Sequence, residues 1–66
     1  MTGESMLRWF EFQHLPSNLR EVSRPFCELA DHVVRTIPSG PERTVALRKL
    51  LEAKDAAVRA ALHPGA

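Results

Sequence analysis

The sequence predicts an all-α protein, an antiparallel helical hairpin with a short N-terminal arm that assembles into a homo-oligomer. Two segments with helical spacing of apolar residues flank Pro38-Ser39-Gly40-Pro41, a combination that ends one helix and begins the next. So short a connection makes the two helices antiparallel neighbours. The chain also has only 66 residues, and folds of this size usually add disulfides, a metal or oligomerisation to a small core.

Of these three ways to stabilise a small fold, the composition favours oligomerisation. Cys27 is the only cysteine, which excludes a disulfide within the chain. The three histidines, His14, His32 and His63, are far apart, and the spacing from Cys27 to His32 does not suit one helix face. We therefore expect no metal and no cofactor.

The chain is expected to form one domain. The first aromatic residues, Trp9, Phe10 and Phe12, fall within four positions without clean alternation, which favours an extended arm folded over the helices. Pro41 and Glu42 suit the first turn of the second helix, and His63-Pro64-Gly65 stops it. The predicted parts of domain 1–66 are a disordered tail at 1–5, the arm at 6–16, a first helix at 17–37 and a second helix at 41–62.

The first helix carries an apolar stripe with steps of three and four residues. Pro25 lies inside this stripe, where proline breaks a backbone hydrogen bond and clashes with the preceding turn. Either the main helix begins near Pro25, with Ser23 as its N-cap, or one helix kinks there; a start or kink at Pro25 is the prediction. The stripe consists of Leu19, Val22, Phe26, Leu29, Val33 and Ile37.

The second helix carries two stripes. Its small residues would let another backbone approach closely, either in this chain or in a second copy. The larger residues are Leu47, Leu50, Leu51, Ala57, Val58 and Ala61, and the small ones are Ala46, Ala53, Ala57 and Ala60.

Composition and charge exclude several classes of function. A formal net charge of +1 argues against a DNA- or RNA-binding protein. One cysteine, no signal-like segment and no long apolar run predict a soluble, cytoplasmic protein without membrane contact. No nucleophile, base and orienting group form a recognisable pattern, so we expect no enzyme.

The arm and the basic residues supply the candidate binding groups. The arm aromatics form either a hydrophobic lid or a platform on which a purine stacks, with Arg24 as a phosphate contact. Lys54 lies on the line of the apolar stripe, where it must snorkel to solvent, pair across an interface or meet an anion in an oligomer pocket. The basic residues of the second helix also allow the pairs Lys49–Glu52, Arg48–Glu52 and Asp55–Arg59.

Most of the chain resembles a known domain. Phe12-Gln13-His14-Leu15-Pro16, then Leu29-Ala30, Pro38 and Pro41–Ala53 are similar to the helical hairpin domain shared by phage anti-CBASS and anti-Thoeris proteins. The resemblance implies a homohexamer of hairpins that acts as a sponge: it binds cyclic oligonucleotide immune signals in an infected bacterial host without cleaving them.

The resemblance also implies site residues. Phe12 or His14 would contact a base, Arg24 would lie near the phosphate, and Arg43 would contact a cyclic trinucleotide. Some members continue with a Trp-Ala-Asn-Ala-like segment where this chain has Ala56–Arg59, so a pocket built on that Trp or Asn is absent or rebuilt. Lys54 and Arg59 are its candidate replacements, and cyclic nucleotides fit better than an ADP-ribose-type ligand.

A second function is compatible with the same helices. A hairpin that dimerises or docks on another protein through its alanine face would need no nucleotide ligand. Arg43 and Lys54 would then be surface or interface ion-pairing residues. Stabilisation by cyclic nucleotides distinguishes the two functions.

Overall fold

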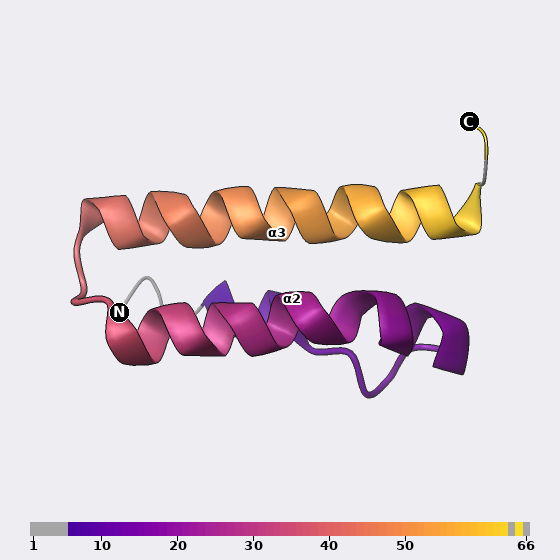
Figure 1. Ribbon diagram of the computed structural model, residues 1–66, viewed down its shortest axis with the longest axis horizontal. Coiled ribbons are helices and arrows are strands. Elements are labelled where there is room, and N and C mark those ends of the chain that lie inside the picture. Colours follow the sequence, from indigo (N-terminus) through magenta and orange to yellow (C-terminus); the bar gives the residue numbers. More distant parts are fainter. Residues whose placement is uncertain (1–5, 64, 66) are drawn as a thin grey trace.

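The computed structural model describes residues 6–63 and 65 and folds them into a helical hairpin with a packed arm. Its elements are the 3-10 helix η1 (Leu7–Phe10) and the α-helices α2 (Ser17–Thr36) and α3 (Pro41–Leu62). Figure 1 shows α2 and α3 side by side and antiparallel, with η1 partly hidden behind α2. This confirms the predicted all-helical hairpin. The expected disordered tail, 1–5, lies outside the described residues.

The turn between the helices follows from its prolines and glycine. Ile37 precedes Pro38 and adopts an extended backbone (φ −114°, ψ 128°), which a residue before proline prefers, so α2 ends at Thr36. Gly40 is the N-cap of α3 and Pro41 is its first residue. The Gly40 carbonyl accepts a 3.1 Å hydrogen bond from the Thr44 amide. The second helix therefore begins where the sequence predicts.

Helix α2 runs without interruption through Pro25, so the predicted alternative of a helix start at this residue is wrong. The first turn forms upstream instead, where the Pro16 carbonyl accepts hydrogen bonds from the amides of Leu19 and Arg20 at 2.9 Å. Ser23 is consequently not an N-cap but a buried residue within the helix. Pro25 itself is exposed, because the apolar stripe turns its neighbours Val22 and Phe26 inward instead.

The arm, residues 6–16, is not extended throughout, contrary to the prediction. It forms η1 and then continues without helix to Pro16. Phe10 has no exposed surface and packs in one cluster with Ala30 of α2 and Leu47 of α3. A helical turn is favoured over an extended arm because it directs Phe10 into the hairpin while Trp9 stays 57% exposed.

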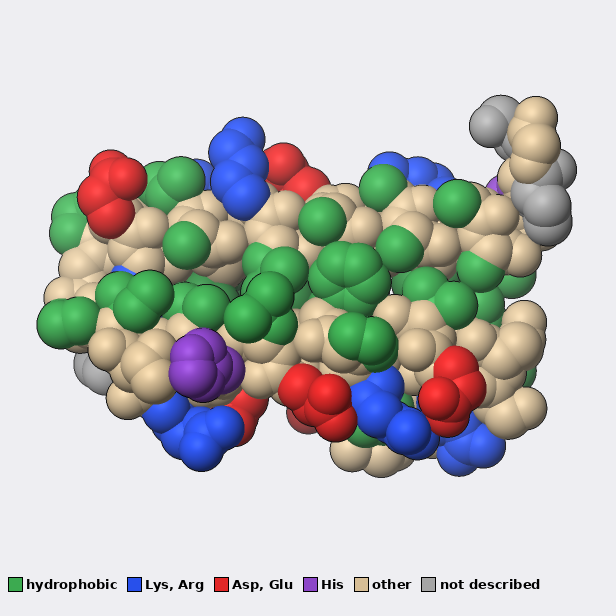
Figure 2. Space-filling model, viewed as in Figure 1, with side chains coloured by type: hydrophobic (Ala, Val, Ile, Leu, Met, Phe, Trp, Pro, Cys, Tyr) green, Lys and Arg blue, Asp and Glu red, His purple; other side chains and the backbone are tan. Residues whose placement is uncertain are grey.

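The buried core of the described chain is small. Its fully or nearly buried apolar residues are Phe10, Leu19, Ala30 and Leu47. In Figure 2, hydrophobic side chains form a band along the seam between the two helices, and charged side chains gather at the outer edges. The large apolar residues with substantial exposure are Trp9, Leu29, Ile37, Val45 and Leu62.

Neither α2 nor α3, within the described part of the chain, is apolar enough over a sufficient length to cross a membrane.

Candidate functional site

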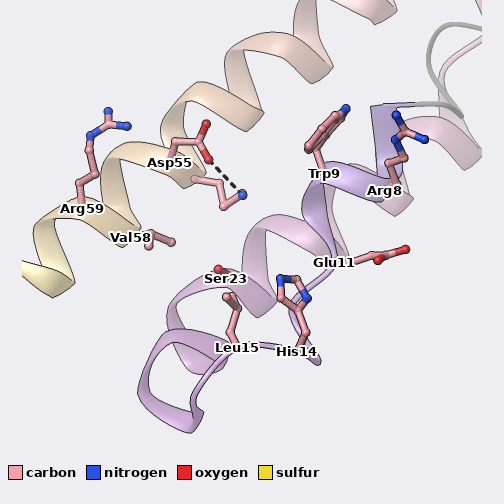
Figure 3. A pocket seen from close by; sticks show the side chains of 10 residues that line it. Arg8, Trp9, Glu11, His14, Leu15, Ser23, Asp55, Val58 and Arg59 are labelled. Atoms are coloured by element: carbon pink, nitrogen blue, oxygen red, sulfur yellow. Dashed lines mark ion pairs between the residues drawn. The ribbon is translucent and has the colours of Figure 1, made fainter.

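A pocket lies where the arm faces the second half of α3, beside the N-terminal half of α2 (Figure 3). We call it the arm pocket. Its volume is about 430 Å³, within the range of small-molecule sites. It is lined by Arg8, Trp9, Glu11, His14, Leu15, Ser23, Lys54, Asp55, Val58 and Arg59.

Lys54 is the most buried cation of this pocket. Only 15% of its side chain is exposed, because it lies four residues after Leu50 on the inward face of α3. Its ammonium group pairs with Asp55 over 3.0 Å, drawn as the dashed line in Figure 3. A lysine whose side chain is largely buried at a pocket attracts anions more strongly than a surface lysine does, because the local dielectric is lower.

Trp9 supplies a flat aromatic surface at the same pocket. The guanidinium carbon of Arg8 lies 5.2 Å from the Trp9 ring centroid, within the distance of a cation–π interaction. Its neighbour Phe10 is fully buried, so the core holds the short helix while Trp9 remains accessible. Accessible indole faces stack on nucleobases, and each such contact contributes about 1–3 kcal/mol.

Ser23 is the least expected member of the pocket. Its side chain is 1% exposed, and its hydroxyl oxygen has no hydrogen-bond partner among the described residues. Figure 3 shows this oxygen directed toward the space between the helices. Buried hydroxyl groups are nearly always paired in native proteins, so an unpaired one requires an explanation.

The predicted site residues fall into three separate places, of which the arm pocket is the first. His14 and Lys54 both line it. Phe12 and Arg24 instead lie against each other, with the guanidinium carbon of Arg24 5.7 Å from the Phe12 ring centroid. Arg24 also pairs with Glu21 over 3.1 Å. Phe12 and Arg24 are therefore not brought to the pocket that holds His14 and Lys54.

Arg43 lies at the turn, in the third place. It is 5% exposed, and its Nη1 donates hydrogen bonds to the carbonyl oxygens of Val34 at 3.2 Å and Ile37 at 3.0 Å. These carbonyl groups are at the C-terminal end of α2, where a cation also interacts favourably with the helix dipole. In this structure Arg43 joins the two helices, and its guanidinium is turned inward.

The ion pairs of α3 agree with the sequence in one case. Lys49 and Glu52 lie 3.7 Å apart, as predicted. Asp55 lies against its neighbour Lys54 rather than against Arg59, because the inward position of Lys54 directs its ammonium along the helix toward the pocket. Arg59 lines the pocket instead.

Sequence reasoning missed Arg8 and Ser23 as members of the site. Arg8 reaches the pocket because η1 turns it there, and no pattern in the arm indicated a helical turn. For Ser23 a signal existed, since it lies four residues after Leu19 and seven before Ala30, on the buried face of a helix that passes through Pro25. The N-cap interpretation concealed that position.

Cys27 lies on the same helix, half-buried. Burial raises the pKa of its thiol, and the carboxylates of Asp31, Glu28 and Glu11 raise that pKa further. At a given pH the thiol therefore holds less of the reactive thiolate form than an ordinary cysteine does. No group of three or more His, Cys, Asp or Glu residues among those described is arranged to hold a metal ion.

Comparison with known proteins found no match among protein-family models, curated proteins or solved structures.

Proposed function

We propose that this protein binds cyclic oligonucleotide second messengers without cleaving them, and that it acts as a sponge for immune signals in the cytoplasm of an infected bacterium. The observation that carries the proposal is the position of Lys54. Lys54, with 15% side-chain exposure, lines the same pocket as the partly exposed Trp9 and the basic residues Arg8 and Arg59.

This combination matches the two chemical parts of a nucleotide. The indole face suits a base, since every base has a π-face that can stack. The cations suit phosphodiester groups, and arginine in particular binds phosphate oxygens in pairs. Asp55 and Glu11 offset part of this charge, which favours a ligand that carries few negative charges in a compact ring over a long polyanion.

Stacking and charge pairing hold a ligand but do not by themselves activate water for attack on phosphorus. His14 and Glu11 also line the pocket, so the proposal of binding without cleavage follows the resemblance, and recovery of the ligand tests it. A ligand held and not consumed lowers the free concentration of the signal in proportion to the amount of protein present.

We also propose that the hairpins associate, with a hexamer as the form that the resemblance implies. The small buried core and the exposed Leu29, Ile37, Val45 and Leu62 support this part of the proposal. A monomer of this size is marginally stable, and burial of apolar surface between copies would contribute about 25 cal/mol per Å².

A thermal-shift panel with cyclic di- and trinucleotides tests the binding. At a hundredfold excess of ligand over Kd, binding stabilises the protein by about 2.7 kcal/mol. The ligand is then released by heating and identified by mass spectrometry; an unchanged ligand supports a sponge and a linearised one indicates an enzyme.

Two lysine variants localise the effect. Lys54→Gln should abolish most of the shift, whereas Lys49→Gln should retain it, because Lys49 is 71% exposed and pairs with Glu52 outside the pocket. An equal loss in both variants would indicate non-specific attraction of anions and would contradict the proposal.

A helical protein-interaction module is the second candidate function. It is favoured by the same exposed apolar residues, Leu29 on α2, Ile37 directly after α2, and Val45 and Leu62 on α3. This function predicts no thermal shift with any cyclic nucleotide and a defined complex through the helical face.

A further inference from the structure

We infer that the hydroxyl group of Ser23 and the ammonium group of Lys54 form an anion subsite in the arm pocket, where they bind a phosphate oxygen of the nucleotide. This inference rests on the proposed function and assigns the phosphate position within it. Both residues line the same pocket, Ser23 from α2 and Lys54 from α3.

The unpaired state of the Ser23 hydroxyl is the first argument. A serine within an α-helix usually donates to the carbonyl oxygen three or four residues earlier, and for Ser23 the fourth is that of Leu19. No such hydrogen bond forms, although the residue is 1% exposed. An unpaired buried hydroxyl destabilises the fold, and a group of this kind is expected where binding needs it.

The charge of the pocket is the second argument. Lys54, whose side chain is 15% exposed, and Arg59, further along α3, bring positive charge to the pocket that Ser23 also lines. The Ser23 hydroxyl needs an acceptor for its hydrogen, and an oxygen of a phosphate diester is the acceptor that the cations lining this pocket attract. A neutral or cationic ligand would leave the lysine with Asp55 alone.

The arm provides the route to the hydroxyl. The Ser23 hydroxyl oxygen has almost no exposed surface, and Leu15 and His14 of the non-helical part of the arm also line the pocket. A ligand reaches the oxygen when one of these side chains moves aside.

Ser23→Ala separates a binding role from a packing role, because the two effects have opposite signs. The variant removes an unpaired buried hydroxyl and introduces a better helix former, so the free protein should melt at a higher temperature. Its affinity for the cyclic nucleotide that the wild type binds best should fall about tenfold or more, since a hydrogen bond to a charged acceptor is lost. Isothermal titration calorimetry measures the affinity, with Ser39→Ala, a turn residue outside the arm pocket, as the control.

The outcomes distinguish this inference from the proposed function. If the wild type binds a cyclic nucleotide and Ser23→Ala binds it equally well, the subsite is wrong and the proposed function stands. If the wild type binds none of the cyclic nucleotides, the proposed function is wrong, and titration with inorganic phosphate decides the subsite. Phosphate-dependent NMR shifts at Ser23 and Lys54 that disappear in Lys54→Gln would support it, and their absence would overturn it.

Discussion

The guanidinium group of Arg43 donates a 3.0 Å hydrogen bond to the carbonyl oxygen of Ile37, which joins the first turn of α3 to the residue that follows α2. Arg43→Ala should therefore lower the free energy of unfolding by about 1–3 kcal/mol. For a domain of this size that corresponds to a fall of about 4–8 °C in melting temperature per kcal/mol. Urea denaturation followed by circular dichroism measures it, with the exposed Arg48→Ala as the control.

The same variant tests the ligand role that the resemblance implies for Arg43. An unchanged melting temperature together with a lost trinucleotide shift would restore that role. A lower melting temperature with intact binding at low temperature would assign Arg43 to the fold.

Two neighbouring aromatic residues of the arm should respond to truncation in opposite ways. Phe10 is fully buried against Ala30 and Leu47, so Phe10→Ala should cost about 3–5 kcal/mol of stability, a large part of what a small domain has. Trp9 is 57% exposed, so Trp9→Ala should leave the melting temperature nearly unchanged and weaken nucleotide binding. Thermal melts with and without ligand separate the two effects, and a Trp9→Ala variant that binds normally would remove the stacking role.

Pro25 should reduce the stability of the helix that contains it. Proline inside a helix is about 3 kcal/mol less favourable than alanine, and Pro25 is exposed on α2. Pro25→Ala should therefore stabilise the protein, by up to this amount, in chemical denaturation. A destabilised variant would mean that the local geometry at Pro25 is needed to seat the arm.

Asp55 should weaken anion binding at the arm pocket, because it neutralises Lys54 over 3.0 Å. Asp55→Asn keeps the shape of the side chain and removes the charge. Since partly exposed ion pairs contribute at most about 1 kcal/mol, affinity for a cyclic dinucleotide should rise by no more than about fivefold. Weaker binding in this variant would mean that Asp55 itself contacts the ligand.

The thiol of Cys27 should react slowly. Burial and the carboxylates of Asp31, Glu28 and Glu11 raise its pKa, so less thiolate is present in the folded than in the unfolded state at a given pH. Alkylation by iodoacetamide at pH 8 should be slower in buffer than in denaturant. Because the folded thiol holds its proton more tightly, this group should favour the folded state below the ordinary thiol pKa of about 8.5. That contribution should be lost as pH rises through the raised pKa.

The parts of the structure that were predicted correctly are those determined by local backbone preferences. The turn is encoded by Pro38, Gly40 and Pro41, whose backbone preferences do not depend on the rest of the chain, and α3 begins at the predicted residue. The hairpin follows from that turn and the periodicity of the two helices.

The parts that were wrong or missed depend on tertiary contacts. Proline preference indicated a break at Pro25, but packing of Leu19 and Ala30 on either side of it keeps α2 continuous. The helical turn of the arm exists because Phe10 fits between the helices, and no local pattern shows that fit. Both wrong predictions concealed the place of Ser23 in the pocket, because that place requires the continuous helix and the folded arm.

The adjacency of Phe10 and Trp9 links recognition to folding. Because Phe10 packs in the core, the position of its neighbour Trp9 is restricted. The conformational entropy lost in presenting the indole to a ligand is therefore lost during folding rather than during binding. The two equilibria are coupled reciprocally. A substitution that weakens packing of Phe10 should lower the affinity of the Trp9 indole for a ligand, and a bound ligand should stabilise packing of the arm on the hairpin. Occupancy would thus be reported by the proteolytic resistance of residues 6–16, without any change in the helices themselves.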